Sequence, residues 1–433
     1  MKKPFHTLIL GLGKSGYSAA TFLAEQGHHI AVADTRAEPP FLSDLQTHYP
    51  DVPFYAGEFT AELIAQAKQL LLSPGVDPHQ TLLNSCGATI IGDIELFAQH
   101  VNKPVVAITG SNGKSTVTTL MGEVLRDAGM NVAIGGNLGT PALDLLKQNA
   151  DIYVLELSSY QLETTYSLQP KVACCLNITP DHLDRHGSFE NYINAKHRIF
   201  QGAAWQVTNA DDENIQASGA KVLSFQQHIN NMQATFTFDA DYIYQANQII
   251  LNTKDLRILG LHNAANVCAV LCMAEALALP LASTLATITA FPGLPHRCEW
   301  AGEVNGVRWI NDSKGTNIGA AVAAIQSFAA QQPQKLIWLA GGQAKGQDFS
   351  EISDILSQFV SDAIVYGEDA DKIAAVVQLP VQLHRVENLE QAIQKAQALA
   401  TPGQTVLFSP ACASFDAFPN FEVRGDAFKK NII

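Results

Sequence analysis

The chain has 433 residues, a formal net charge of −14 at pH 7 and an apolar content of 47%. Its length exceeds what one hydrophobic core usually organises, so we expect two or three domains. The negative charge argues against a surface for nucleic acid or for an anionic membrane. No apolar stretch reaches the ~18 residues of a membrane helix. Lys2 and Lys3 precede an apolar run too short for a signal peptide, so we expect a soluble, cytoplasmic protein.

The seven cysteines show neither a C-x-x-C pair nor a zinc-binding spacing. They are Cys86, Cys174, Cys175, Cys268, Cys272, Cys298 and Cys412. Cys268 and Cys272 would share one face of a helix, where we expect buried small apolar side chains rather than metal ligands.

The first predicted unit is an apolar strand at 7–10, the loop Gly11-Leu12-Gly13-Lys14-Ser15-Gly16, and a helix. Asp34 ends the next strand, and Arg36 follows it. This pattern is typical of a dinucleotide site, but glycines and a helix N-terminus hold any diphosphate. Two interpretations stay open: an NAD-dependent dehydrogenase, or an enzyme that holds a nucleotide-linked substrate here. We favour the second because of the motif that follows.

The second unit is the most informative stretch of the chain. An apolar strand at 104–108 leads into Thr109-Gly110-Ser111-Asn112-Gly113-Lys114-Ser115-Thr116, and a helical pattern follows. Backbone N–H groups of such a loop wrap phosphate oxygens, the lysine neutralises them, and a hydroxyl reaches Mg²⁺. A full P-loop motif would place glycine where Ile108 stands. The remaining core still predicts nucleotide phosphate binding.

Polar residues then follow two further apolar strands. Glu156 ends the strand at 152–155, where a carboxylate can hold Mg²⁺, although a solvated strand-end acid is the alternative. His182 follows the strand at 172–176 and could contact a cation or substrate, or be a hydrogen-bonded structural histidine. Lys196 lies in a helical pattern at 192–200, where a solvated lysine is the default expectation.

A third strand, at 335–340, leads into Gly341-Gly342-Gln343-Ala344-Lys345-Gly346, a third candidate phosphate loop. Residues 201–260 predict short strands and turns. Repeated strand–loop–helix units indicate parallel sheets with helical crossovers. We therefore predict an α/β protein of three domains, at 1–92, 93–297 and 298–433. The first is Rossmann-like, the second a P-loop ATPase-like parallel sheet, and the third Rossmann-like α/β.

The ordered combination of motifs over essentially the whole chain resembles the Mur ligase family of ATP-dependent, amide-forming ligases. Besides the three loops, it comprises Asp34-Thr35-Arg36, Ser73-Pro74-Gly75, 92–97, Gly135-Gly136-Asn137, 156–159, 181–185, His262-Asn263, 294–297, 311–314, 409–414 and 420–422. Family members carry a shortened Thr-Gly-x-Asn-Gly-Lys-Ser/Thr loop, which accounts for Ile108. Within the family, the chain is similar to members that add D-glutamate to UDP-N-acetylmuramoyl-L-alanine through an acyl phosphate.

The resemblance implies three groups of binding residues. Those for the UDP-linked substrate are Gly13, Lys14, Ser15, Asp34, Thr35, Arg36, Ser73, Asn137 and His182. Those for ATP are Gly110, Ser111, Asn112, Gly113, Lys114, Ser115, Thr116, Asn263, Arg297 and Asp312. Those for D-glutamate are Lys314, Thr316, Lys345, Ser414 and Phe421.

The resemblance also implies a Mg²⁺ site formed by Ser115, Glu156, His182 and a carbamylated Lys196, with Lys114, His182 and Lys196 as catalytic residues. Carbamylation needs a neutral amine, and hence a lowered lysine pKa. Gly315 lies between two of the D-glutamate residues, and we expect it to make that loop flexible.

Four alternatives remain. A sibling ligase for another amino acid is disfavoured because no Asp-Asn-Pro-Arg stretch is present. Folate polyglutamylating enzymes lack the N-terminal glycine-rich domain. A dehydrogenase would need NAD turnover, and a nucleotide switch would bind ATP without consuming it when an amino acid is supplied.

Overall fold

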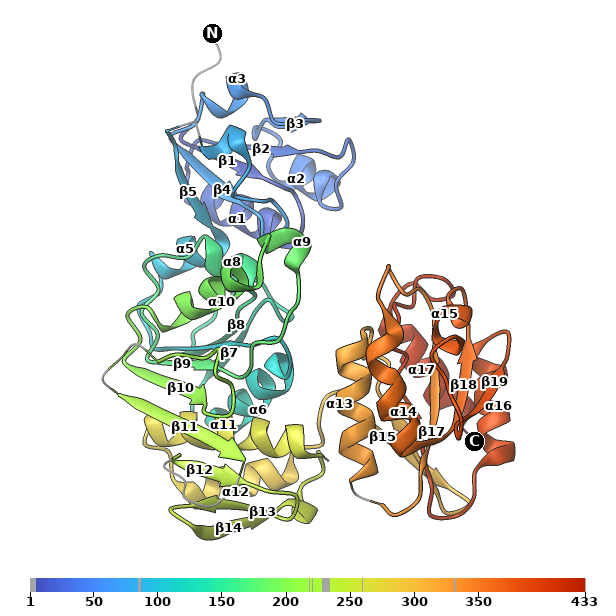
Figure 1. The fold of residues 1–433 in the computed structure, drawn as a ribbon. Coiled ribbons are helices and arrows are strands. Elements are labelled where there is room, and N and C mark those ends of the chain that lie inside the picture. The colour runs from blue at the N-terminus through green and yellow to red at the C-terminus, as the bar shows by residue number, and fades with distance from the viewer. Residues whose placement is uncertain are drawn as a thin grey trace. The chain divides into compact units, whose positions relative to one another are not determined.

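The computed structural model describes residues 5–84, 87–217, 219, 221–227, 234–258, 260–330 and 332–432. Lys2, Lys3 and Cys86 lie outside these residues. The chain divides into two compact units, one of residues 1–237 with 266–288 and the other of residues 238–265 with 289–433. Its strands form three sheets with helices between them, which confirms the predicted α/β class with three sheets (Figure 1).

The N-terminal sheet has five strands in the order β3-β2-β1-β4-β5, and its pairings are parallel. The strands are β1 (Thr7–Leu10), β2 (Ile30–Asp34), β3 (Phe54–Ala56), β4 (Gln69–Leu72) and β5 (Thr89–Gly92). The helices are α1 (Lys14–Glu25), α2 (Leu42–His48), α3 (Ala61–Ile64), α4 (Thr81–Asn84) and α5 (Asp93–Ala98). Strand order reverses between β1 and β4, and such a switch point is where open α/β sheets bind ligands.

The second sheet has nine strands in the order β14-β13-β12-β11-β10-β9-β6-β8-β7. They are β6 (Val105–Thr109), β7 (Val132–Gly136), β8 (Ile152–Glu156), β9 (Val172–Cys175), β10 (Trp205–Asn209), β11 (Val222–Gln227), β12 (Phe236–Phe238), β13 (Tyr242–Gln245) and β14 (Gln248–Asn252). β6 pairs in parallel with both β8 and β9, so their carboxyl ends meet at one edge. The prediction of short strands in 201–260 is confirmed.

The helices of this region connect the strands and bring polar residues to that edge. They are α6 (Lys114–Asp127), α7 (Ala142–Leu145), α8 (Ser159–Glu163), α9 (Leu183–His186), α10 (Phe189–His197), η1 (Arg198–Phe200), η2 (Thr253–Asp255), α11 (Leu261–Ala276) and α12 (Leu281–Ala290). Cys268 and Cys272 are both free thiols buried in α11, as predicted. Six of the cysteines are described, and each of them is free.

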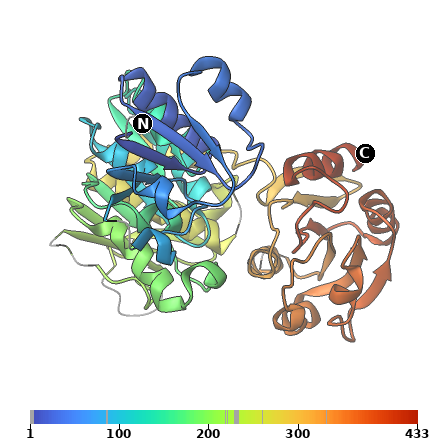
Figure 2. The same ribbon diagram turned by 90° about the horizontal axis from the view of Figure 1, so that it is seen from above.

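The C-terminal sheet has six strands in the order β15-β16-β20-β17-β18-β19. They are β15 (Glu299–Val304), β16 (Val307–Asn311), β17 (Leu336–Gly341), β18 (Val360–Tyr366), β19 (Gln382–Arg385) and β20 (Thr405–Phe408). Its helical segments are α13 (Ile318–Ala329), η3 (Phe349–Ile352), α14 (Ser353–Phe359), α15 (Ala370–Ala374), α16 (Leu389–Leu399) and α17 (Phe421–Asn431). Two separate apolar clusters lie on the two faces, one with α13 and α14 and one with α16 and α17 (Figures 1 and 2).

The third candidate phosphate loop, after β17, differs from the strand–loop–helix unit that we predicted. The residues after β17 enter the short 3-10 segment η3 rather than an α-helix at the end of the loop. A Cβ on Gly341 would lie 2.0 Å from the Tyr366 oxygen, and one on Gly342 would lie 2.2 Å from the Ala413 oxygen. These glycines therefore permit close backbone packing.

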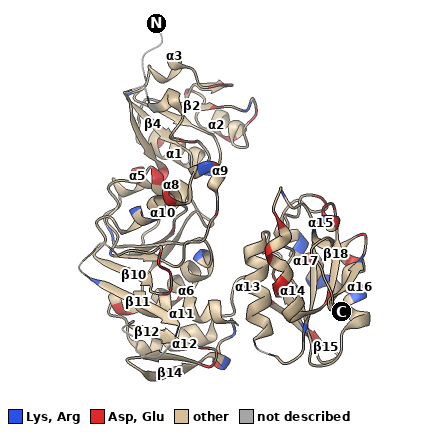
Figure 3. Cartoon of the chain, in the orientation of Figure 1, with Lys and Arg blue, Asp and Glu red and all other residues tan. Residues whose placement is uncertain are grey.

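Among the described residues, no helix is both long and apolar enough to cross a membrane. Acidic and basic positions are interspersed along the elements in the view of Figure 3.

Candidate active site

The glycine-rich loop after β1 is held in place by Asp34 and Ser73. The backbone N–H of Leu12 donates to Asp34 Oδ2 at 2.7 Å, and Ser73 Oγ donates to the Gly11 oxygen at 2.8 Å. A Cβ on Gly16 would lie 1.9 Å from that same Gly11 oxygen, so the first turn of α1 can approach the loop only with glycine there. Two neighbouring strand ends, those of β1 and β4, thus build one rigid edge.

Arg36 forms a two-armed contact with Asp34, at 2.8 Å from Nε and 2.7 Å from Nη2. Burial alone would raise the pKa of Asp34, but hydrogen bonds from Arg36 and from the Leu12 backbone outweigh it and lower the pKa to about 2. The carboxylate is buried, whereas the Arg36 side chain is 53% exposed. The guanidinium is therefore anchored at its base and open to an anionic ligand.

Lys14, Ser15 and Thr35 lie at the same edge. Lys14 Nζ donates to the Gly139 oxygen at 2.6 Å, and Ser15 donates to the buried carboxyl of Asp93. Thr35 is exposed, and a Cβ on Gly13 would meet nothing within 4 Å. The predicted residues of the first domain are thus gathered around one open strand edge.

The loop after β6 is braced by a side chain from the segment after β9 and one from α10. Asn177 accepts from the Asn112 N–H at 2.8 Å and donates back to the Asn112 oxygen at 3.1 Å. Ser111 Oγ lies 2.8 Å from the Tyr192 hydroxyl. Gly113 has φ 82°, and a Cβ there would lie 2.5 Å from Asn266 Oδ1, so glycine is required for two reasons.

Lys114 begins α6, and its ammonium folds over the loop. Nζ donates to the Gly110 oxygen at 2.7 Å and to the Ser111 oxygen at 2.9 Å. Ser115 and Thr116 follow it and are buried at the base of the loop. The predicted phosphate-binding residues from Gly110 to Thr116 thus form one continuous strand–loop–helix cradle.

Lys196 is fully buried on α10, so the default expectation of a solvated lysine is wrong. Its Nζ donates to the Gly110 oxygen at 2.8 Å and lies 4.7 Å from the centre of the Tyr192 ring. Burial, reinforced by the charge of Lys114, lowers the pKa of Lys196 to about 7. A substantial neutral fraction of this amine is therefore present near neutral pH.

Glu156 is buried at the end of β8, so the alternative of a solvated strand-end acid is wrong. Oε1 accepts from Asn137 Nδ2 at 2.7 Å, whereas Oε2 is buried without a hydrogen-bond partner. An orphaned carboxylate oxygen beside a P-loop is suited to a hard cation, which commonly takes one or two carboxylates plus phosphates and waters. Among the described residues, no group of three or more His, Cys, Asp or Glu side chains is arranged to hold a metal ion by itself.

His182 is placed differently from Glu156 and Lys196. It has φ 53°, its side chain is 49% exposed, and its Nε2 lies 3.5 Å from Asp181 Oδ2. Its ring packs against Tyr160 at 5.1 Å between centroids. Its exposure and its contact with Asp181 set it apart from the buried Glu156 and Lys196.

A second group of predicted residues gathers at the carboxyl end of the C-terminal sheet. Asp312 follows β16, is buried, and accepts from Ser409 Oγ at 2.7 Å and from the Cys298 N–H at 3.2 Å. Burial raises the pKa of Asp312 to about 6, although the nearby Arg297 charge opposes this. Asn263, predicted for the ATP base, is buried in α11.

Gly315 corrects the expectation of a flexible loop. A Cβ at this position would lie 2.4 Å from Asp312 Oδ2 and 2.7 Å from Ser409 Oγ. Glycine is needed here for close packing, so the segment that leads to Thr316 is tightly held rather than loose.

The two lysines predicted for D-glutamate each rest on an aromatic ring. Lys314 Nζ lies 4.0 Å from the centre of the Phe421 ring, and Lys345 Nζ lies 4.7 Å from that of Phe415. Phe415 is 60% exposed, which is unusual for phenylalanine, and it adjoins the buried Ser414. Cations held over rings keep their charge available to an incoming carboxylate.

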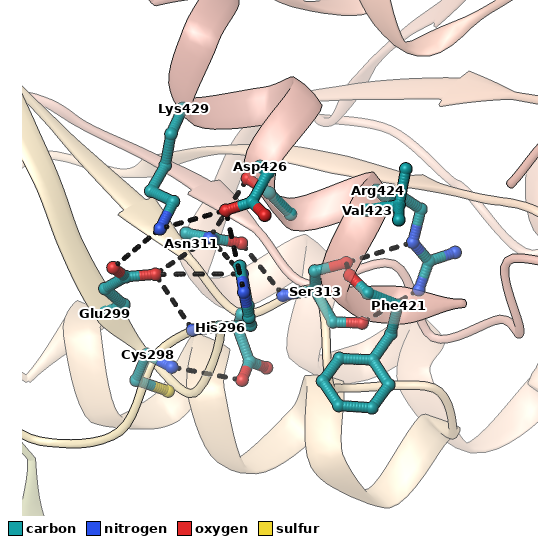
Figure 4. A network of polar contacts seen from close by, with 12 residues as sticks. His296, Cys298, Glu299, Asn311, Ser313, Phe421, Val423, Arg424, Asp426 and Lys429 are labelled. Atoms are coloured by element: carbon teal, nitrogen blue, oxygen red, sulfur yellow. Dashed lines mark hydrogen bonds and ion pairs between the residues drawn. The ribbon is translucent and has the colours of Figure 1, made fainter. Parts of the chain in front are cut away.

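Sequence reasoning missed Arg424, which is buried in α17. Its Nη2 donates to the Ser313 oxygen at 2.9 Å and to the Cys412 oxygen at 3.0 Å, and its Nε donates to Ser313 Oγ at 3.1 Å. Nη1 contacts the Gly341 oxygen at 3.4 Å. One guanidinium thus ties together the three segments that bear Lys314, Lys345 and Ser414. Figure 4 shows its contact with Ser313. An arginine inside an otherwise apolar helix face was the available signal.

Beside it, His296 belongs to a polar network that also includes Glu299 and Asn311 (Figure 4). Asn311 Nδ2 lies 3.0 Å from both His296 Nδ1 and Glu299 Oε2, and Lys429 Nζ lies 3.0 Å from Glu299 Oε1. This network fixes the start of the segment from Asn311 to Lys314.

Three family models match the chain. They are described as the Mur ligase MurD-like N-terminal domain over residues 5–92, the Mur ligase middle domain over 108–274, and the Mur ligase glutamate ligase domain over 296–412.

Relatives are similar over nearly the whole length. A protein of Nitrosococcus oceani named UDP-N-acetylmuramoylalanine–D-glutamate ligase is 47% identical, covering 98% of this chain and 96% of the relative. One of the same name from Legionella pneumophila is 44% identical, covering 98% of each.

Among solved structures, MurF ligase from Thermotoga maritima in complex with ADP matches with a TM-score of 0.64 at 16% identity, over 100% of this chain and 96% of its own. UDP-N-acetylmuramate-alanine ligase MurC of the same organism matches with a TM-score of 0.62 at 18% identity, over 98% of each chain. These two likenesses concern the fold.

Proposed function

This chain belongs to the Mur ligase family, and on that premise we propose that it is an ATP-dependent ligase that joins D-glutamate to UDP-N-acetylmuramoyl-L-alanine in cytoplasmic peptidoglycan precursor synthesis. The full-length similarity to relatives of that name supports the choice of amino acid and of UDP-linked acceptor. In this proposal residues 1–92 bind the UDP-linked substrate, 93–297 bind ATP, and 298–433 bind the amino acid.

The observation that carries the proposal is the phosphate cradle after β6 with a buried amine and an orphaned carboxylate beside it. Lys114 and Lys196 both donate to the Gly110 oxygen, at 2.7 and 2.8 Å. Glu156 Oε2 has no partner in its buried position at the end of the neighbouring strand β8. A purely structural loop would not assemble two cations and an unsatisfied anion around a helix N-terminus.

A carboxylate is a poor electrophile, so amide formation requires activation. The alanyl carboxylate of the UDP-linked substrate attacks the γ-phosphorus of ATP, the bond to the β-phosphate oxygen breaks, and ADP leaves. The amine of D-glutamate then attacks the acyl phosphate carbon, loses a proton, and expels inorganic phosphate. Lys114 stabilises the charge that spreads over the transferring phosphoryl group.

Glu156, whose buried Oε2 has no hydrogen-bond partner, fits a magnesium ion. We assign Ser115, His182 and carbamylated Lys196 as the further residues that would hold it, some through water. Mg²⁺ bound there would neutralise phosphate oxygens. The carbamate forms when the neutral Lys196 amine adds to CO₂ and releases one proton. The burial that lowers the pKa of Lys196 to about 7 supports this step. Asn137 holds Glu156 in orientation through its 2.7 Å hydrogen bond.

The two substrate ends are bound by separate groups of side chains. The UDP portion is held by Asp34, Thr35, Arg36 and Ser73, together with the loop at Gly13, Lys14 and Ser15. The portion further along the substrate is contacted by Asn137 and His182. Arg36 supplies the open cation of this group. D-Glutamate is held by Lys314, Thr316, Lys345, Ser414 and Phe421. The two lysines form ion pairs with its carboxylates. Asn263, Arg297 and Asp312 hold the base and ribose of ATP.

An ADP-release assay tests the proposal. The purified chain is given ATP, Mg²⁺ and UDP-N-acetylmuramoyl-L-alanine with a panel of D- and L-amino acids, and the joined product is identified by mass. We expect turnover with D-glutamate and less than ~1% of that rate with L-glutamate or meso-diaminopimelate, because stereochemistry decides which carboxylate reaches each lysine. Ligation of a different amino acid, or ligation without ATP, would contradict it.

A further inference from the structure

Arg185, on the short helix α9, is almost buried between the N-terminal sheet and α8. Its side chain is 11% exposed, and its Nη2 donates to Glu163 Oε2 at 2.9 Å and to the Val76 oxygen at 3.2 Å. Its Nε lies 3.6 Å from Asp77 Oδ1, and its guanidinium lies 4.7 Å from the centre of the Tyr160 ring. Four different groups therefore fix one guanidinium.

The loop on one side of Arg185 is the segment after β4, residues 73–77. Ser73 Oγ donates to the Gly11 oxygen, and the Val76 N–H donates to the Ser73 oxygen at 2.9 Å. A Cβ on Gly11 would lie 2.9 Å from Ser73 Cβ and 3.3 Å from Val76 Cγ2, so the segment packs directly on the glycine-rich loop. Moving residues 73–77 would therefore move the diphosphate end of the proposed UDP site.

The other side of Arg185 leads to the reaction site. The Arg185 N–H donates to the His182 oxygen at 3.1 Å, and the His186 N–H donates to the same oxygen at 3.0 Å. His182 stands at φ 53°, a conformation that depends on such surrounding contacts. One helical turn thus links His182 to the guanidinium.

Glu163 anchors this guanidinium to α8. Its side chain is only 8% exposed, and Oε1 lies 3.2 Å from His186 Nδ1 and 3.5 Å from His79 Nε2. His186 Nε2 in turn lies 3.0 Å from Ser159 Oγ. The carboxylate therefore gathers contacts from residues on both sides of Arg185, including the segment just beyond Asp77.

We propose that Arg185 is a positioning residue that latches residues 73–77 onto α8 and α9, and so fixes the distance between the UDP end and the reacting end of the substrate site. The proposal rests on the proposed function for its substrate. A substrate held at the Gly11 loop must place its carboxylate beside the P-loop, and misplacement by about 1 Å can cost 10²-fold in rate. Arginine suits the task because its planar fork serves several acceptors at once.

The test compares Arg185→Met and Arg185→Lys with Arg126→Met, a matched loss of an exposed arginine on α6. Hydrogen exchange of the ligand-free protein reports the latch itself. We expect Arg185→Met to speed exchange at the amides of residues 76–79 by at least ~10-fold, with the amides of β1 and β6 unchanged. Arg185→Lys should be intermediate, and Arg126→Met should match the wild type.

Calorimetric titration with UDP and with UDP-N-acetylmuramoyl-L-alanine measures how the loss of the latch changes the affinity for each part of the substrate. We expect Arg185→Met to bind UDP within about threefold of the wild type, and to lose ~10-fold or more of the extra affinity gained from the muramoyl-alanyl portion, with a lowered kcat. A residue with a merely structural role would lower the affinity for both ligands equally, together with the unfolding temperature. That result, or unchanged exchange at residues 76–79, would overturn the proposal.

Glu163→Gln provides a second route if Arg185→Met does not fold, because it keeps the shape of the side chain and removes the charge that pairs with Arg185. The same pattern of exchange and affinity is expected. If the wild type does not bind the UDP-linked substrate at all, the proposed function fails, whereas the exchange experiment still decides whether the latch exists.

Discussion

Two lysines share one carbonyl oxygen in the loop after β6. Lys114 and Lys196 each donate to the Gly110 oxygen, and both side chains lie close to the strand end that carries Glu156. Their charges disfavour one another, and this is part of why the pKa of the buried Lys196 falls to about 7 while burial supplies the larger share. The loop therefore holds one permanent cation and one amine that can become neutral.

Replacing Lys114 with alanine should remove catalysis and leave the fold intact. Its Nζ contacts are with carbonyl oxygens of its own loop, so their loss exposes groups that water can satisfy. We expect kcat to fall at least ~10³-fold, the upper range for loss of one charge-stabilising group. Lys147→Ala, which breaks a surface pair with Glu25, is the matched control and should retain activity. ADP release and the unfolding temperature are the measurements; near-normal turnover in Lys114→Ala would remove it from the mechanism.

Replacing Lys196 with alanine should abolish turnover through loss of the carbamate, and short carboxylates should partly restore it. A bound formate or acetate would supply the missing carboxylate in the space left by the side chain. We expect rescue to saturate with carboxylate concentration and chloride to have no effect, as followed by ADP release. Full activity of Lys196→Ala without added carboxylate would refute the carbamate.

At the scale of single residues, the sequence predicted the loop that depends on local backbone geometry. It did not predict the burial of Lys196, which depends on contacts between segments distant in the chain. The loop from Gly110 to Thr116 could be predicted because its glycines and lysine belong to a local strand–loop–helix geometry. Lys196 has His197 and Arg198 beside it, so its pattern indicates a solvated helix face. Its burial depends on contact with the loop 86 residues earlier, which no local pattern encodes.

At the scale of elements, α17 sets the spacing of the C-terminal loops through the side chain of Arg424. Arg424 donates to the Ser313, Gly341 and Cys412 oxygens. Gly341 ends β17, and the other two residues belong to the loops after β16 and β20. The segments after these three strands bear Lys314, Lys345 and Ser414, so Arg424 sets their spacing. Phe421, at the start of the same helix, is itself predicted to bind the amino acid.

Arg424→Met should therefore raise the KM for D-glutamate about 10-fold or more and leave the KM for the UDP-linked substrate within twofold. Three buried carbonyl oxygens would lose a charged donor, at ~1–3 kcal/mol for each unsatisfied group, so the unfolding temperature should also fall. Arg424→Lys should recover part of the KM effect, and Lys430→Met, an exposed change on the same helix, should do nothing. Equal changes in both KM values, measured by steady-state kinetics, would show a general loss of structure instead.

Glycines show where sequence patterns mislead at this scale. The runs after β1, β6 and β17 look alike in sequence, but only the first two lead directly into a helix of eight or more residues. Gly341 and Gly342 accommodate the backbone of neighbouring loops, and Gly315 accommodates Asp312 and Ser409. Sequence identifies a glycine but not which neighbour its missing Cβ would have met.

At the scale of the whole molecule, alternating strands and helices predicted the α/β class and parallel strand pairing, because crossovers of that length require it. The pair β13–β14 of the central sheet and the pair β15–β16 of the C-terminal sheet are antiparallel, so neither sheet is parallel throughout. Strand order was not predictable, since β6 pairs with β8 and β9 through contacts distant in sequence. The two compact units also interleave along the chain: residues 238–265 belong with 289–433, and 266–288 with 1–237. Composition changes along a sequence do not reveal such an exchange.

This division leads to a prediction about ligand protection. The predicted residues for the UDP-linked substrate, for phosphate and for metal lie in the unit of residues 1–237 and 266–288, and those for D-glutamate lie in the other unit. A ligand at 100 times its Kd stabilises its binding region by ~2.7 kcal/mol, which slows amide exchange about 100-fold where opening requires release. UDP-N-acetylmuramoyl-L-alanine alone should therefore protect residues 11–16 and 73–77, and D-glutamate alone should protect 311–316 and 409–414. NAD⁺ is the control for the dehydrogenase alternative and should protect neither group of residues. Hydrogen exchange followed by mass spectrometry measures the protection given by each of the three ligands. Protection of residues 11–16 by NAD⁺ would favour the dehydrogenase alternative.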